Sequence, residues 1–285
     1  MTIKIVTDST ADLPQALAEK LGITVVPLYV QFGHNTYRDR IDISEEEFYQ
    51  RLLSDSVHPS TSQPTPQDFA DVYNKLSKQA DGIISIHISN KLSGTCNSAL
   101  QGKEIVATEC PIEVIDSEMV SMGLGLIAAK AATIASSKKD LQHVVEEVKQ
   151  LIPETRVWAL FDTLRYLALG GRIGKAKELL GSILSIKPIL LVKDGEMAPA
   201  TQTRSRSKGI DLLYNFASNF TNIQDLAVMY TTTLDDAKAL ANRLSAIFNR
   251  EQIIIARLGP ALGVHAGPGA LALALRGSTN IPMSV

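Results

Sequence analysis

Hydrophobic positions in the first half of the chain fall into short runs, separated by longer segments with helical periodicity. The short runs predict strands at residues 3–6, 24–32, 83–88 and 112–115. The longer segments predict helices at residues 13–21, 45–53, 66–78 and 94–107, with a further helix from about residue 117. This alternation is typical of βαβ units, so the first half predicts an α/β fold with a mainly parallel sheet.

The pattern changes after Pro153. Strands are predicted at residues 157–161, 189–193, 226–231 and 253–258, and helices at about residues 173–184, 208–220 and 234–248. Asp194-Gly195 predicts a hairpin, because this pair favours the tight turn between antiparallel strands. We therefore expect an N-terminal α/β domain at residues 1–153. The C-terminal α/β domain, residues 154–285, should contain a mixed or antiparallel sheet.

The composition is that of an ordinary globular protein. Of 285 residues, 45% are hydrophobic and 20% charged, and the net charge of −2 gives no basic surface for nucleic acid. The most apolar stretch, residues 122–135, contains Lys130 and is too short to cross a bilayer. The first residues do not form a signal-peptide core. We expect a cytoplasmic protein with no nucleic-acid partner and at most transient membrane contact.

No metal, nucleotide or redox motif stands out. Cys96 and Cys110 lack CxxC spacing, and the five histidines lack metal-ligand spacing, so we expect reduced thiols and no metal. Residues 170–176 resemble a P-loop, but Ala176 replaces the hydroxyl that would bind magnesium. Residues 123–128 match G-x-G-x-x-A inside a predicted helix, and G-x-S-x-G is absent. We predict no cofactor.

Polar residues follow three predicted strands, at residues 7–10, 89–95 and 116–117. Because ligands bind beyond the carboxyl ends of parallel strands, these segments should meet at one crevice. Ser93 precedes a predicted helix, so its hydroxyl and the amides of Gly94 and Thr95 either bind an anion or simply cap the helix. Asp8 and Asp116 either belong to this crevice or act as turn residues that hold their loops. A second hydroxyl-rich segment covers residues 60–66.

Seven short motifs, in order along residues 7–269, resemble the DegV family of bacterial proteins. They are Thr7-Asp8-Ser9-Thr10-Ala11-Asp12-Leu13-Pro14, Thr61-Ser62-Gln63-Pro64-Thr65-Pro66, Leu92-Ser93-Gly94-Thr95, Asp116-Ser117, Gly171-Arg172-Ile173, Ile186-Lys187-Pro188-Ile189-Leu190 and His265-x-Gly267-Pro268-Gly269. No single motif is specific to the family, but the seven motifs in this order are. Cys96 departs from the family, whose members often have an aromatic residue there.

The resemblance implies a two-domain α/β protein that buries one long-chain fatty acid as its ligand. It further implies a non-catalytic subunit that presents the carboxylate to a separate ATP-binding kinase subunit, whose acyl-phosphate product enters phospholipid synthesis. The carboxylate would be held by the two hydroxyl segments and by the histidine before Gly-Pro-Gly, here Thr61, Ser62, Ser93, Gly94, Thr95 and His265. Arg172, in the Gly-Arg-Ile motif, would lie at the partner surface.

Two further cations, Arg204 and Arg206, precede a predicted helix and are assigned to the same partner surface, although a solvated helix start explains them equally well. Two alternative functions stay open. Ser93 and His265 are candidates for the nucleophile and base of a serine-dependent lipid hydrolase. The other alternative is a regulatory interaction protein in which the lipid is only structural.

Overall fold

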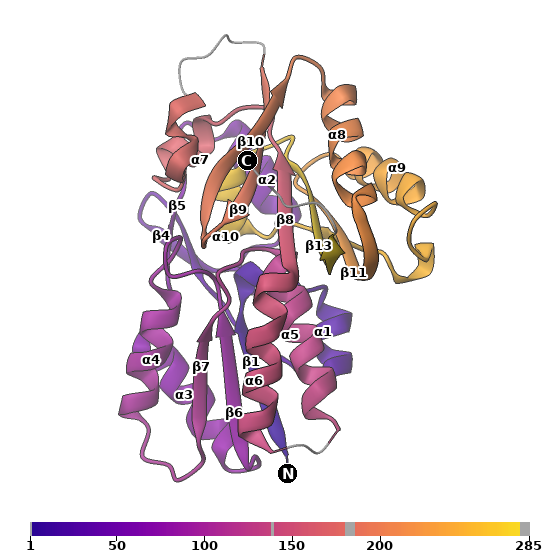
Figure 1. Ribbon diagram of the computed structural model, residues 1–285. Coiled ribbons are helices and arrows are strands. Elements are labelled where there is room, and N and C mark those ends of the chain that lie inside the picture. The colour runs from indigo at the N-terminus through magenta and orange to yellow at the C-terminus, as the bar shows by residue number, and fades with distance from the viewer. Residues whose placement is uncertain (1, 138–139, 180–185, 280–285) are drawn as a thin grey trace.

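The computed structural model describes residues 2–137, 140–179 and 186–279. Figure 1 shows two sheets, one in each half of the molecule, with helices packed against both. One sheet is parallel and the other is mixed, so the predicted α/β fold class is confirmed. The division into two domains near residue 153 stays a prediction.

The first sheet contains four parallel strands in the order β2-β1-β6-β7. Their bounds are β1 (Ile3–Asp8), β2 (Thr24–Val26), β6 (Gly82–His87) and β7 (Ile112–Asp116). All six residues of β6 are buried, as its continuous apolar run predicts. One face packs against α3 (Pro66–Ser77) and α4 (Thr95–Ile105), and the other against α1 (Gln15–Leu21), α5 (Met122–Ala135) and α6 (Leu141–Leu151).

The second sheet contains six strands in the order β10-β9-β8-β13-β11-β12, of which only β11 and β12 pair in parallel. Their bounds are β8 (Thr155–Leu160), β9 (Lys187–Lys193), β10 (Glu196–Thr203), β11 (Phe220–Tyr230), β12 (Ile254–Arg257) and β13 (Leu271–Thr279). The predicted Asp194-Gly195 hairpin is confirmed, with φ of 51° and 78° at these two residues. Helices α8 (Arg206–Ser218) and α9 (Leu234–Leu244) cover one face.

Strand β13 has leucine and alanine in alternation. Leu271, Leu273 and Leu275 pack with α8 and α9, whereas Ala272 and Ala274 belong to the core on the opposite face. Successive strand residues face opposite sides of a sheet, so this alternation gives one face large side chains and the other small ones. The sheet therefore has room on the face that is turned away from α8 and α9.

A third, small antiparallel sheet joins the two halves. It has the order β4-β3-β5, from β3 (Tyr29–Phe32), β4 (Asn35–Arg38) and β5 (Ser60–Ser62). Helices α2 (Glu45–Ser54) and α10 (Pro260–Ala266) pack near it, and α10 in turn contacts α7 (Arg165–Leu169). Short 3-10 helices complete the elements: η1 (Ser9–Ala11), η2 (Ile152–Glu154), η3 (Gly174–Leu179) and η4 (Arg250–Gln252).

Three predicted elements differ from the structure. The single strand expected at residues 24–32 is divided between two sheets, with Pro27 in the break, where a proline cannot donate to a strand ladder. The helix expected from about residue 117 begins at Met122, after two residues with positive φ, Glu118 and Ser121. The helix expected at residues 173–184 is a 3-10 helix over Gly174–Leu179, and its remainder lies outside the described residues.

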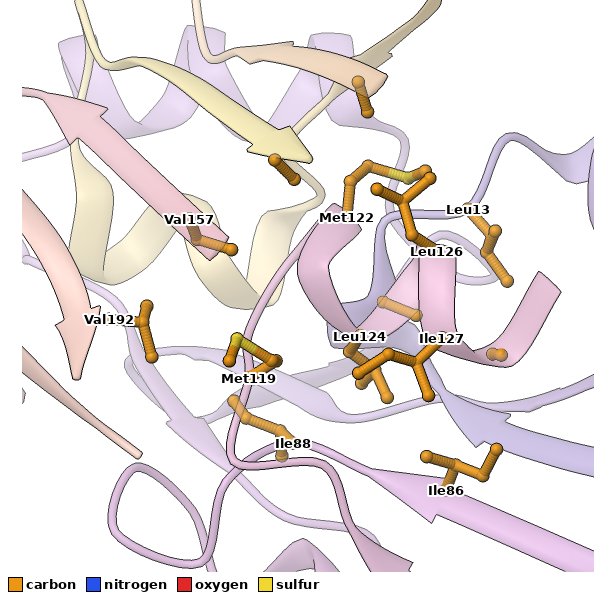
Figure 2. Close-up of a cluster of buried hydrophobic side chains, with 14 of the residues drawn as sticks. Leu13, Ile86, Ile88, Met119, Met122, Leu124, Leu126, Ile127, Val157 and Val192 are labelled. Atoms are coloured by element: carbon orange, nitrogen blue, oxygen red, sulfur yellow. The ribbon is translucent and has the colours of Figure 1, made fainter. Parts of the chain in front are cut away.

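Helix α5 connects the two sheets through the largest hydrophobic core. It packs against β1 of the first sheet and against β8, β11 and β13 of the second. Figure 2 shows side chains of α5 gathered with Ile86 and Ile88 from the first half and with Val157 and Val192 from the second. Within the described residues, no helix is both long enough and apolar enough to cross a membrane.

Candidate functional site

A cavity of about 280 Å³ lies between the two sheets. Its wall is mostly apolar and is formed by side chains from both halves of the chain. These apolar residues are Leu28, Ile88, Leu92, Val120, Val157, Ala159, Phe161, Leu167, Met197, Met229, Leu258, Ala261, Leu262, Ala266, Ala270 and Ala272. Small side chains from β8 and β13 leave this space open, and Met197 and Met229 add flexible thioether side chains to the wall.

Polar residues form one end of the cavity. They are Thr61, Ser62, Gln63, Ser93, Arg172 and His265, and Gln63 and Arg172 among them are exposed to solvent. Two further polar residues, Thr10 and Ser121, are buried elsewhere in the lining. The hydroxyl segment at residues 60–66 and the Ser93 segment therefore meet at one opening, together with the C-terminal end of α10. Of the predicted carboxylate-binding residues, four line the cavity: Thr61, Ser62, Ser93 and His265.

Thr61 and His265 form the central contact of this opening. Thr61 lies in the edge strand β5, where it pairs with Val30, and its Oγ1 is 2.9 Å from Nε2 of His265 in the last turn of α10. The helix ends there because Gly267 adopts a φ of 68°, a conformation that favours glycine. A side chain at Gly170 would clash, since its Cβ would lie 2.0 Å from Nδ1 of His265.

His265 is neutral at neutral pH in this environment. Burial lowers its pKa from 6.5 to about 4, and the nearby cation Arg172 and the imidazole of His58 act in the same direction. Its Nδ1 is buried without a hydrogen-bond partner among the described residues. Because a catalytic histidine usually needs a group that orients its second nitrogen, this arrangement does not favour a catalytic base.

Ser93 lies beside the start of α4, but the N-cap position belongs to Gly94. Ser93 Oγ is 2.8 Å from Thr95 Oγ1 and accepts a hydrogen bond from the Thr95 amide at 3.3 Å. The Thr95 amide is therefore engaged inside the chain, which disfavours a direct contact with an anion, one of the two alternatives left open by the sequence. Gly94 and Thr95 lie behind Ser93, outside the cavity wall.

Gln63 belongs to this opening, although sequence reasoning did not select it. Its carboxamide lies so close to Gly94 that an added Cβ there would be 2.5 Å from Oε1, and its Nε2 donates to Ser98 at 3.3 Å. Gln63 thus connects the 60–66 segment to the first turn of α4. The sequence feature that could have identified Gln63 is its position in the Thr-Ser-Gln-Pro segment, directly after the predicted site residues Thr61 and Ser62.

The three predicted partner arginines have different surroundings. Arg172 lines the cavity, and its guanidinium donates to the carbonyls of Leu92 and Gly170 at 3.1 and 2.7 Å. Arg204 is exposed in the loop between β10 and α8. Arg206 donates to Asp236, Asp162, Thr233 and the carbonyl of Gly269, so its guanidinium is held inside the C-terminal half.

The carboxylates at the last positions of strands β1 and β7 hold the turns that follow these strands. Asp8 is fully buried and accepts hydrogen bonds from the amides of Thr10 and Ile88, and it contacts His87 Nδ1 at 2.9 Å. Asp116 accepts from the amides of Asn90 and Glu118. Neither carboxylate lines the cavity.

The site gives little support for a serine-dependent hydrolase or for a metal-binding protein. Ser93 is paired with Thr95 and His265 with Thr61, so no base contacts the Ser93 hydroxyl in the described structure, and the hydrolase hypothesis lacks its central contact. No group of three or more potential metal ligands occurs in residues 2–137, 140–179 and 186–279. Cys96 and Cys110 are free thiols, and buried Cys96 does not line the cavity, so its effect on the ligand stays a prediction.

The fold and this site define an α/β protein with an apolar cavity that opens between hydrogen-bonding side chains, of which Arg172 carries a charge. Residues 2–277 match the family model described as "Uncharacterised protein, DegV family", so the chain belongs to the DegV family. It is similar to a DegV domain-containing protein of Caldanaerobacter subterraneus subsp. tengcongensis, with 35% identity over 276 residues, 94% of this chain and 96% of the relative.

Solved structures of similar proteins extend the comparison. A DegV family protein from Thermus thermophilus, described by its fatty acid binding, has a TM-score of 0.90 and 34% identity, covering 98% of this chain and 100% of its own. A stearic acid-binding protein from Eubacterium ventriosum has a TM-score of 0.86 and 28% identity, covering 96% of this chain and 98% of its own.

Proposed function

We propose that the chain binds one long-chain fatty acid, with the acyl chain in the apolar cavity and the carboxylate at its polar end. The observation that carries this proposal is the pairing of an apolar wall with the hydroxyls of Thr61 and Ser93 and the imidazole of His265 at one opening. Ser62 lies beside Thr61 at this opening, whereas Thr95 acts by holding the Ser93 hydroxyl, and Gly94 is the N-cap residue of α4. The fatty acid binding described for similar structures supports the same ligand.

The energetics favour such a ligand. A long acyl chain carries about 14 methylenes, and burial of each contributes about 0.8 kcal/mol, or roughly 11 kcal/mol in total. Lost translational freedom and ordering of the chain oppose binding. The acyl chain therefore supplies most of the affinity, and the polar end determines the orientation of the ligand.

The donors at the polar end suit a carboxylate that remains reactive. Hydroxyls and a neutral imidazole form single hydrogen bonds, whereas a bidentate arginine would occupy both oxygens. Arg172 is the one charged residue among the described cavity residues, and two of its nitrogens already donate to backbone carbonyls. One carboxylate oxygen therefore remains available as a phosphoryl acceptor.

The fatty acid is presented, in this proposal, to a separate ATP-dependent kinase subunit in the cytoplasm, and the acyl-phosphate enters phospholipid synthesis. Phosphoryl transfer needs a nucleotide and magnesium, which the kinase subunit would supply. Arg172 at the cavity opening and exposed Arg204 would meet the acidic face of this partner. Arg206 contributes less directly, because its guanidinium is held within the chain.

Mass spectrometry of the organic extract from gently purified protein tests ligand binding. We expect about one long-chain fatty acid per chain. A different lipid class, a nucleotide, or an empty protein that does not take up added fatty acid would contradict the proposal. Acyl-phosphate formation with a kinase subunit then distinguishes a substrate carrier from a protein in which the lipid is only structural or regulatory.

A further inference from the structure

One buried carboxylate joins three segments that are far apart in the sequence. Asp12 is 1% exposed and accepts hydrogen bonds from each of these segments. Its Oδ1 accepts from the backbone amide of Gly259 at 2.8 Å and from Arg40 at 3.0 Å, and its Oδ2 accepts from the Ser121 hydroxyl at 2.7 Å. The proposed fatty acid site has not yet given this group a role.

The bond to Gly259 fixes the start of α10. Gly259 is the N-cap residue of this helix, and it has no side chain that could cap the helix itself. Arg40 packs against the same residue, since a Cβ added to Gly259 would lie 2.7 Å from its Nε. Arg40 is not free to move aside, because it also pairs with Glu45 at 3.0 Å and donates to the carbonyl of Arg257 at 2.8 Å. Asp12 and Arg40 together therefore hold this end of α10.

Helix α10 carries the position of its first residue directly into the acyl site. It has only seven residues, or about two turns. His265, in the last turn, contacts Thr61 at 2.9 Å. Ala261 and Leu262, in the first turn, line the apolar wall. A displacement at the start of so short a helix moves all of these side chains together.

The turn at Asp12 and its bond to Ser121 bring the first half of the chain into the same arrangement. Asp12 follows η1 with a φ of 52°, a conformation that aspartate adopts more readily than most residues. Ser121 lies directly before α5 and lines the acyl cavity, and its hydroxyl donates to Asp12 instead of capping α5. The carboxylate therefore connects the starts of two helices that border the cavity, one from each half.

We propose that Asp12 is a positioning residue for the fatty acid site: by holding the start of α10, it keeps His265 beside Thr61 at the polar end of the cavity. This inference rests on the proposed fatty acid binding. The alternative is that Asp12 only stabilises the fold, as any buried ion pair does. The two roles differ in their effect on His265, because only a positioning residue changes the surroundings of that imidazole.

Two substitutions at Asp12 separate the carboxylate from the turn. Asp12→Gly removes the carboxylate and suits the positive φ, so the turn is kept. Asp12→Asn is the conservative variant, because its Oδ1 can still accept from Gly259 and its Nδ2 can donate to the Ser121 oxygen. A protonated Asp12 would use its Oδ2 in the same way. Asp12→Asn should therefore retain the position of α10 that Asp12→Gly loses.

The matched control is Asp225→Ala, which breaks an arginine–carboxylate pair elsewhere. Asp225 pairs with Arg276 at 2.6 Å, and Arg276 keeps a second carboxylate partner, as Arg40 does. The pair lies between β11 and β13, and its loss leaves the start of α10 unchanged. A variant that is only less stable should behave like this control.

NMR titration of the His265 imidazole in the delipidated full chain gives a measurement that needs no ligand. Burial lowers the pKa of His265 to about 4. We expect Asp12→Gly to raise this pKa toward the ordinary value of 6.5, because a displaced α10 lets water reach the ring. Asp12→Asn and Asp225→Ala should leave it near 4. Affinity for a fluorescent fatty acid should fall about tenfold or more in Asp12→Gly alone, the loss expected for one hydrogen bond to a charged group.

Three results would overturn the proposal: an unchanged pKa of His265 in Asp12→Gly, an equal rise in Asp225→Ala, or an unchanged fatty acid affinity after the pKa has risen. Should Asp12→Gly fail to fold by circular dichroism, Gly259→Ala decides, because its Cβ pushes α10 away from Arg40. A raised pKa of His265 in that variant supports the proposal, and an unchanged pKa rejects it. A wild-type protein that takes up no fatty acid would instead reject the acyl site, and the titration would still show whether Asp12 holds α10.

Discussion

The contact between Thr61 and His265 joins residues that are 204 positions apart in the sequence. One comes from an edge strand in the first half, and the other from a short helix near the end of the chain. Their pairing places two neutral hydrogen-bonding groups at one opening, with Ser93 as a third. At the residue scale, the proposed carboxylate site therefore depends on orientation rather than on charge.

Removal of one hydroxyl should weaken fatty acid binding without unfolding the protein. We expect Thr61→Val and Ser93→Ala each to raise the dissociation constant about tenfold or more, from the loss of about 1.5–3 kcal/mol for a hydrogen bond to a charged group. Binding of a fluorescent fatty acid to delipidated protein measures the effect. Ser60→Ala is the control, because exposed Ser60 lies in the same strand but outside the cavity wall. Wild-type affinity in both variants would place the carboxylate elsewhere.

Sequence motifs selected Thr61, Ser62, Ser93 and His265 as site residues, and all four line the cavity. They could be selected because each belongs to a short local segment. The role of the Thr95 amide could not be predicted in the same way. It depends on the turn geometry that lets Ser93 Oγ accept from it, and the neighbouring sequence is equally consistent with a free amide. Gln63 was missed for a related reason, since its contact with Gly94 brings together two separate segments.

At the scale of elements, β13 shows how the cavity is made. Its leucines pack under α8 and α9, and its alanines face the opposite side, where Ala272 lines the cavity. Sequence analysis missed this central strand, because alanine and leucine both favour helices and the alternation is one of size instead of polarity. The strands rich in β-branched residues, such as β6, were predicted correctly.

Ala272→Leu should shorten the space for the acyl chain. The added side chain enters a cavity rather than a packed core, so we expect the fold to be retained. Each methylene that is displaced from the cavity loses about 0.8 kcal/mol, or about fourfold in affinity. Competition among fatty acids of increasing length should show a selective loss for the longest. Ala246→Leu, at an exposed position, is the control. An equal loss for all lengths would contradict this assignment of the cavity.

At the scale of the whole molecule, the two sheets act together through α5 and the acyl cavity. The first half supplies Thr61 and Ser93, and the second supplies His265 and all five alanines that line the cavity. The two sheet types were predictable from local patterns, but their packing was not, since no local periodicity encodes which faces meet. The small sheet that carries Thr61 was also missed, because its strands have only three or four residues.

The proposed kinase partner should be sensitive to Arg204. This residue is exposed and lies outside the cavity wall, so Arg204→Ala should leave fatty acid binding unchanged and lower phosphorylation at limiting kinase subunit, most clearly at low salt. Titration of the kinase subunit against wild type and variant measures the change. Lys238→Ala, on α9, is a control at another basic residue. Equal half-saturation at every salt concentration would remove Arg204 from the partner surface.

Asp39, between the two halves, should make stability depend on pH. Burial raises its pKa from 3.8 to about 6, although Arg40 opposes the shift. Between these two pH values the folded chain binds more protons than the unfolded chain, so the stability contributed by this group falls as pH rises from about 4 to 6 and is constant above about 7. The shift of about two pKa units corresponds to roughly 3 kcal/mol at neutral pH.

Asp39→Asn should therefore be more stable than wild type at pH 7.5, and this gain should shrink toward pH 4.5. Urea unfolding at a series of pH values gives the difference between the two proteins, in which contributions from groups that do not interact with Asp39 cancel. Burial, with a smaller contribution from the Asp39 charge, raises the pKa of Asp12 to about 7, so a change in the Asp12 contribution is part of the measured difference. Asp42→Asn should instead be less stable than wild type by a nearly constant amount over this pH range, because the hydrogen bond from Arg38 lowers the pKa of Asp42 to about 2 and this contribution is lost only below about pH 4. A variant less stable than wild type at pH 7.5 would mean that the favourable interactions of the Asp39 carboxylate, with Arg40 above all, outweigh the cost of its burial.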